Sequence, residues 1–148
     1  MVNEKLKVTG DVSMVLRDET GKVKETKEIK NLVVTSGLGF IASRMKDATA
    51  TAMSHMAVGT GATAAALGDT TLGAEVAASR TALTSTTVST NTVQYACTFG
   101  AGVGTGALTE AGIFNASSSG TMLCRTVFSA VNKAAGDSLT ITWTITIS

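Results

Sequence analysis

The stretch Ser138–Ser148, SLTITWTITIS, decides the fold of this chain. Apolar residues and threonines alternate strictly along it. One row contains Leu139, Ile141, Trp143, Ile145 and Ile147, and the other contains Thr140, Thr142, Thr144 and Thr146. Successive side chains of a strand point to opposite faces of a sheet, so the pattern predicts a strand with one apolar and one threonine face. Such a strand needs neighbours that pair with its backbone and a second layer that covers its apolar face.

Further alternating segments recur along the chain with turn residues between them. They indicate about seven to nine strands in total, at a spacing typical of sandwich-like β folds. We therefore predict a mainly β protein, a jelly-roll-like antiparallel β-sandwich with one short helix. A single domain, residues 1–148, is expected to comprise an N-terminal hairpin (5–30), a helix (37–46), a long loop (59–78) and a C-terminal β core (79–148). The predicted core residues are Trp143, Ile141, Ile145, Phe99 and Phe128.

The helix is predicted from a change of period after the N-terminal hairpin. Leu38, Ile41, Ala42 and Met45 are spaced as one face of a helix, and this face is expected to pack on the β structure. Thr35 or Ser36 is the expected N-cap, because a side-chain oxygen there can accept a backbone N–H of the first turn.

The segment Gly59–Ala78 is rich in small residues and offers little for packing. It is expected to be a long loop with one helical turn from Asp69 to Val76. Loops of this length in a compact domain are usually functional or mobile, so this one is our candidate contact arm. The predicted interface residues are Thr60, Thr63, Leu67, Asp69, Leu72 and Glu75 in this loop, and Thr142 on the threonine face.

The composition is poor in charge. Charged residues make up 16% of the chain, against about a quarter in typical domains. Either partners cover much of the surface, or the chain is a β protein built from small residues. The net charge is +1 without a basic cluster, so we expect no nucleic-acid partner. No apolar run is as long as a membrane span, and the charged N-terminus does not resemble a signal peptide, so synthesis in a cytosol is expected.

No constellation of residues predicts catalysis, a cofactor or a metal site. The only histidine, His55, lacks the Cys, His or Asp neighbours of a metal site and the serine pattern of a catalytic triad. The glycine-rich stretches Gly59–Gly61 and Gly100–Gly106 lack the lysine and the following helix of a phosphate-binding loop, and both are interpreted as flexible loops. The chain is therefore not expected to be an enzyme.

Two further features concern the interior. Glu110 stands alone among apolar residues and requires a cationic partner, for which Arg125 and Arg80 are the candidates. A structural ion pair, within the chain or across an interface, is the leading prediction, with Glu110 and Arg125 as its expected members. Cys97 and Cys124 both fall in predicted strands. Two buried free thiols are the default in a reducing compartment, whereas a disulfide would require the two strands to be neighbours.

Several stretches, in this order, resemble the small virion structural proteins of tailed bacteriophages. They are Asn31–Gly37 (NLVVTSG), Ile41–Met45 (IASRM), Met56–Gly61 (MAVGTG), Asp69–Gly73 (DTTLG), Leu108–Asn115 (LTEAGIFN) and Leu139–Trp143 (LTITW). The resemblance spans the chain from about Asn31 to its end. Its motifs are structural and contain no catalytic signature, so it implies a class of protein more than one exact role.

What the resemblance implies is a virion protein made in the cytoplasm of a bacterial host. The first hypothesis is a capsid cement, or decoration, protein that binds the major capsid protein and forms a dimer or trimer on the shell. The alternative is a tail, baseplate or fibre-associated protein, although a receptor-binding fibre usually has a long trimerising shaft. A carbohydrate-binding sandwich is a third hypothesis, weakened by an aromatic content of only 4%.

Overall fold

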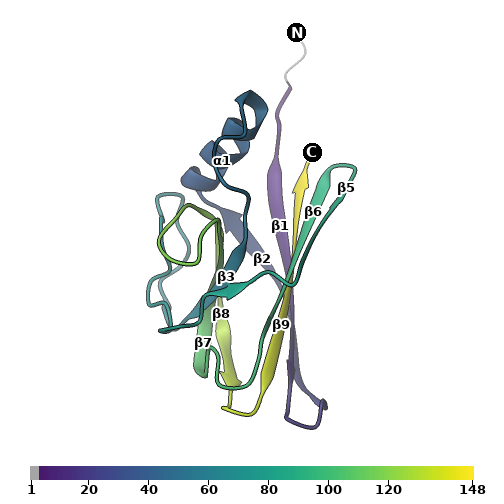
Figure 1. The fold of residues 1–148 in the computed structure, drawn as a ribbon, viewed down its shortest axis with the longest axis vertical. Helices are drawn as coiled ribbons and strands as arrows, with labels where there is room; N and C mark the ends of the chain where they lie inside the picture. The colour runs from purple at the N-terminus through teal and green to yellow at the C-terminus, as the bar shows by residue number, and fades with distance from the viewer. Residues whose placement is uncertain (1–3) are drawn as a thin grey trace.

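A computed structural model describes residues 4–148. Within this range the chain forms nine strands and one helix (Figure 1). In chain order they are β1 (Val8–Arg17), β2 (Val23–Val33), α1 (Thr35–Lys46), β3 (His55–Gly59), β4 (Thr81–Ala82), β5 (Ser85–Ser89), β6 (Thr92–Phe99), β7 (Gly106–Phe114), β8 (Met122–Lys133) and β9 (Ser138–Ile147). The prediction of a mainly β protein with one helix is confirmed.

All strands belong to one antiparallel sheet in the order β4-β3-β7-β8-β2-β1-β9-β6-β5. The sheet curls back on itself because β2 is long enough to serve both halves. Residues 23–31 of β2 pair with β1, whereas Leu32 and Val33 pair with β8. One half contains β5, β6, β9 and β1, and the other contains β8, β7, β3 and β4. The antiparallel sheet is thus as predicted, but its strand order does not by itself confirm a jelly roll.

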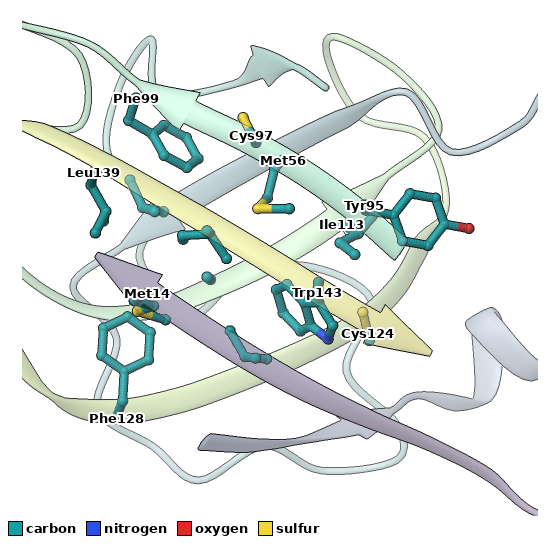
Figure 2. Packing of buried hydrophobic residues seen from close by; sticks show 14 of the residues in the cluster. Met14, Met56, Tyr95, Cys97, Phe99, Ile113, Cys124, Phe128, Leu139 and Trp143 are labelled. Carbon is teal, nitrogen blue, oxygen red and sulfur yellow. The ribbon is translucent and has the colours of Figure 1, made fainter. Parts of the chain in front are cut away.

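The opening stretch of the sequence is β9, which lies between β1 and β6. Its apolar row faces the inside of the curl. Trp143 is opposite Val12 on β1 and Tyr95 on β6. The five predicted core residues are all buried, with exposures of 0% for Trp143, Ile141 and Phe99, 3% for Ile145 and 8% for Phe128. Figure 2 shows Trp143, Phe99 and Phe128 among Met14, Met56 and Ile113 from other strands, and Ile141 and Ile145 belong to the same cluster. Each large apolar side chain buried here contributes about 1.5–3 kcal/mol.

Helix α1 begins two residues earlier than predicted, at Thr35. The predicted cap is wrong, because Val34 occupies the N-cap position and no side chain caps the helix. The Ser36 hydroxyl instead donates a hydrogen bond to the Met122 carbonyl, 2.9 Å away.

The predicted packing face of the helix is also wrong, except at Ile41. Leu38 and Met45 are 43% and 86% exposed, and the residues that pack on the core are Phe40 and Ile41. Gly37 explains the rotation. A Cβ on Gly37 would lie 2.0 Å from the Leu123 carbonyl oxygen of β8, so only glycine lets the first turn approach that strand so closely. Gly37, Phe40 and Ile41 then share the inner face at helical spacing.

Cys97 lies on β6 and Cys124 on β8, and both are buried free thiols. The two strands are not neighbours in the sheet. Burial raises the pKa of Cys97 to about 12 and raises that of Cys124 well above its usual value. Both thiols therefore stay protonated at neutral pH and are poor nucleophiles.

Candidate interaction surfaces

The predicted loop (59–78) starts at the last residue of β3, and residues 60–78 run beside that strand, on the side of the molecule opposite the β5–β6 hairpin (Figure 1). It contains no helix, so the predicted helical turn from Asp69 to Val76 does not form. Its only ladder contact is an isolated bridge between Gly59 and Glu75. Irregular backbone of this length needs other partners for its N–H groups.

Glu110 supplies these partners. Its side chain points from β7 under the loop and is completely buried. Oε1 accepts hydrogen bonds from the N–H groups of Gly61 (2.9 Å) and Ala74 (2.7 Å), and Oε2 accepts one from Gly73 (2.9 Å). One carboxylate thus fixes both ends of the loop. Glu110 is therefore a structural anchor of the loop.

The glycines of the Gly59–Gly61 stretch have a structural role that was not predicted. A Cβ on either Gly59 or Gly61 would lie 2.5 Å from Glu110 Oε1. These glycines allow the backbone to close over the carboxylate, a role that their interpretation as a flexible loop did not include. The sequence signal was present, since an isolated Glu110 and a glycine pair with no phosphate chemistry each needed an explanation.

Arg125 of β8 completes the anchor. Its Nε and Nη2 lie 2.9 and 2.8 Å from Glu110 Oε2, and its Nη1 lies 2.8 Å from Asp69 Oδ2. Nη2 also donates to the Thr63 carbonyl at 3.0 Å. Of the two candidate partners of Glu110, the structure therefore selects Arg125. Asp69 as a second partner was not predicted.

Arg80, the other candidate, lies elsewhere on the same side of the sheet. Its Nε is 2.9 Å from Glu75 Oε1, and its guanidinium stacks on the Phe114 ring at 3.6 Å from the ring centre. The Glu75–Arg80 pair is more exposed than the Glu110–Arg125 pair. Breaking the Glu75–Arg80 pair should therefore cost less stability than breaking the Glu110–Arg125 pair.

The electrostatics keep the cluster ionised. Burial would raise the pKa of Glu110, but the N–H groups of Ala74 and Gly73, with Arg125, lower it overall. The Ala66 N–H and Arg125 lower the pKa of Asp69. Burial would lower the pKa of Arg125, but its two carboxylate partners raise it. None of the three groups is poised to exchange a proton near neutral pH.

The loop presents only part of the predicted interface. Thr60, Thr63 and Leu67 are exposed, the last at 55%. Asp69 and Glu75 are engaged in the ion pairs described above. Leu72 is wrong as an interface residue, because it is 5% exposed. It packs in a small apolar cluster with Val34, Ala57, Phe114 and Met122, beneath the loop.

The threonine face forms the second candidate surface. The β9 threonines, Thr142 among them, are half-buried on the outer side of the sheet. They are opposite Thr92, Gln94, Ala96 and Thr98 of β6. Ser85, Thr87 and Ser89 extend the same face on β5 through their pairing with β6. No Asp, Glu, Lys or Arg occurs from Thr81 to Thr109 or from Ser138 to Ser148, so this outer face, over β5, β6 and β9, is neutral.

An apolar cavity of about 350 Å³ opens between α1 and the ends of β5, β6 and β9. Its lining includes Phe40, Ile41, Val88, Tyr95 and Ile145, with Arg44 as its single charged residue. Burial raises the pKa of Tyr95 to about 12. No sequence pattern indicated this cavity, which helix α1 borders with Phe40, Ile41 and Arg44.

His55 lies at the start of β3, where its Nδ1 is 2.8 Å from the Ser54 hydroxyl. Among residues 4–148, no three His, Cys, Asp or Glu side chains are grouped to hold a metal ion.

The one helix of this range is too short to cross a membrane. Comparisons of the chain with protein-family models, curated proteins and solved structures gave no significant match.

Proposed function

We propose that this chain is a structural protein of a tailed-phage virion that binds across neighbouring major capsid subunits and stabilises the head. The observation that carries the proposal is the anchoring of the loop by Glu110. A buried carboxylate holds an irregular, largely exposed segment in one conformation through three backbone N–H groups. A loop fixed in advance loses little conformational entropy on binding, so it suits a contact surface.

The second support is the neutral threonine face on the opposite half of the molecule. Charge-poor surfaces are suited to contact with another protein, because no strongly hydrated groups have to be desolvated. Two separate surfaces allow one copy to contact two capsid subunits, and repetition over a shell adds avidity to each weak contact. The jelly-roll-like sandwich remains part of the proposal, and it is supported by the two facing antiparallel halves of the curled sheet.

The proposal is tested with expanded phage heads assembled without this protein. Purified protein is expected to cosediment with the heads and to raise the temperature at which they release DNA. Immunogold labelling of complete virions distinguishes the two sites of action. A label on the head supports a cement protein, and a label confined to the tail or baseplate supports the alternative role in its place.

A pair of variants connects the binding to the anchored loop. Leu67→Asp places a charge on the exposed loop surface, and Leu38→Asp places the same charge on an exposed helix position outside it. Both variants are expected to fold. Leu67→Asp should weaken head binding by about tenfold or more, which corresponds to 1.4 kcal/mol, while Leu38→Asp binds as the wild type does. Equal binding by both variants would remove the loop from the proposed contact.

A further inference from the structure

The two ends of the sheet are protected very differently. The outer edge of β3 is covered, first by β4 opposite His55 and Met56, and then by the loop. The Val76 N–H donates to the Val58 carbonyl (3.0 Å), and the Thr60 N–H donates to the Ala74 carbonyl (2.9 Å). At the other end of the sheet, β5 pairs only with β6. All five residues of β5 are exposed, and nothing among the described residues pairs with its outer edge.

β5 also lacks the features that usually keep an open edge from pairing. Proteins protect such edges with charged side chains, proline or a β-bulge. The sequence of β5 is STTVS, its register with β6 is unbroken from Ser85 to Ser89, and the chain contains no proline. By contrast, strand β2 has the sequence VKETKEIKNLV, which is rich in Lys and Glu. The β5 edge is therefore free to accept another strand.

We infer that β5 pairs antiparallel with β5 of a second copy of this chain, about a two-fold axis. A two-fold axis places the same short strand on both sides, so a charged strand would meet its own charges, whereas β5 has none. If the axis passes beside Thr87, then Thr87 meets Thr87, Ser85 meets Ser89 and Thr86 meets Val88. Threonine and β-branched cross-strand pairs of this kind are favourable.

The pairing also explains the position of Val88. This side chain is 72% exposed, although it lies beside the apolar cavity that Thr86 also lines. In the two-fold arrangement Thr86 of the second copy lies against Val88 and covers part of its exposed surface. On the opposite face, Ser85, Thr87 and Ser89 join the two neutral threonine faces into one surface across both copies. The dimer deepens the proposed virion function by making the binder bivalent, but the pairing itself rests only on the β5 edge.

The test is the oligomeric state of the full chain in the absence of heads. Sedimentation equilibrium of the wild type should show a monomer–dimer equilibrium at concentrations up to about 1 mM. Thr87→Lys brings two like charges together at the axis and should raise the dissociation constant by about tenfold or more. Thr98→Lys is the matched control, because it adds the same charge to an exposed position on the outer face of β6, away from the edge. Its dissociation constant should match that of the wild type.

A cysteine variant tests the register. Thr87→Cys should form a disulfide-linked dimer with oxidised glutathione as the oxidant, whereas Thr98→Cys should not. The native thiols of Cys97 and Cys124 are buried and do not compete. A wild type that stays monomeric up to about 1 mM, or a dimer equally affected by Thr87→Lys and Thr98→Lys, would overturn the inference. Such a result would leave the head-binding test untouched, because that test does not depend on self-association.

Discussion

The β3 end and the β5 end of the same sheet are completed by opposite chemistry. At the β3 end an irregular loop closes over the sheet, and the buried charges of Glu110 and Arg125, with the half-buried Asp69, satisfy its backbone. At the β5 end a regular hairpin satisfies its own backbone on one side, and no charge occurs from Thr81 to Thr109. In these two regions, buried charge occurs where regular strand pairing stops. A carboxylate can accept several hydrogen bonds from N–H groups that no neighbouring strand reaches.

The same difference predicts which changes destabilise each end of the sheet. A buried ion pair contributes little compared with apolar residues of the same shape, but removal of one member leaves the other charge buried without compensation. The β5 end has no such interaction and depends on apolar burial beneath β6 and β9. The loop end should therefore respond to single charge removals and to acid, and the hairpin end to loss of apolar volume.

The largest effect is expected beneath the hairpin end, from Trp143→Ala. This change removes the largest fully buried side chain and should cost about 3–5 kcal/mol, a large part of the stability of an ordinary domain. Urea unfolding followed by circular dichroism measures it. Trp143→Phe is the control and should cost clearly less, since it keeps a ring there and removes an indole N–H that has no hydrogen-bond partner. Equal losses of stability in the two variants would show that the indole N–H edge of Trp143, and not its buried volume, determines the cost.

At the loop end, Glu110→Ala should cost about 3 kcal/mol, the lower end of the range for breaking a buried pair. It stays at that end because Arg125 retains Asp69 and the Thr63 carbonyl as partners. The measurement is urea unfolding followed by the fluorescence of Trp143. Glu75→Ala breaks the more exposed pair with Arg80 and should cost about 1 kcal/mol or less. A similar small cost for both variants would contradict the anchoring role of Glu110.

A smaller effect is expected from acid. The pKa of Glu110 is lowered on folding, so its contribution to stability is complete above the pKa of the unfolded chain, about 4.3. It is lost as the pH falls through the lower pKa of the folded state. The wild type should therefore exceed Glu110→Gln in stability at pH 7, and this advantage should shrink below about pH 4. Urea titrations at a series of pH values measure the difference. An advantage that is constant down to pH 2 would mean that folding does not lower the pKa of Glu110.

The two ends also differ in how far the sequence predicts them. The alternation of Ser138–Ser148 places Trp143 in the core and the threonines outside, because a strand has only two faces. The isolated Glu110 likewise predicts a buried cation partner nearby. Period and chemistry suffice for these features, since each depends on residues close together in sequence or on a simple charge balance.

The remaining features depend on approaches that no local pattern encodes. The face of α1 is set by the contact of Gly37 with the β8 backbone, which outweighs the spacing of Leu38 and Met45. Leu72 is buried because the loop brings it against Phe114. The polar residues near Leu72 in the sequence predict exposure instead. Asp69 meets Arg125 across 56 positions of sequence. Such long-range contacts become visible only when the sheet has curled.

The smallest effect on folding, and the sharpest test of the neutral face, is expected from Thr142→Lys. Its cross-strand neighbours, Ser13 and Ala96, are small and uncharged, so a lysine can extend outward between them. Stability to urea should change by only about 0.5 kcal/mol, while cosedimentation with phage heads should weaken. Thr26→Lys, at an exposed position among the charges of β2, is the control and should bind as the wild type does. If Thr142→Lys also binds normally, the threonine face is ordinary solvent-exposed surface, and head binding belongs to the anchored loop alone.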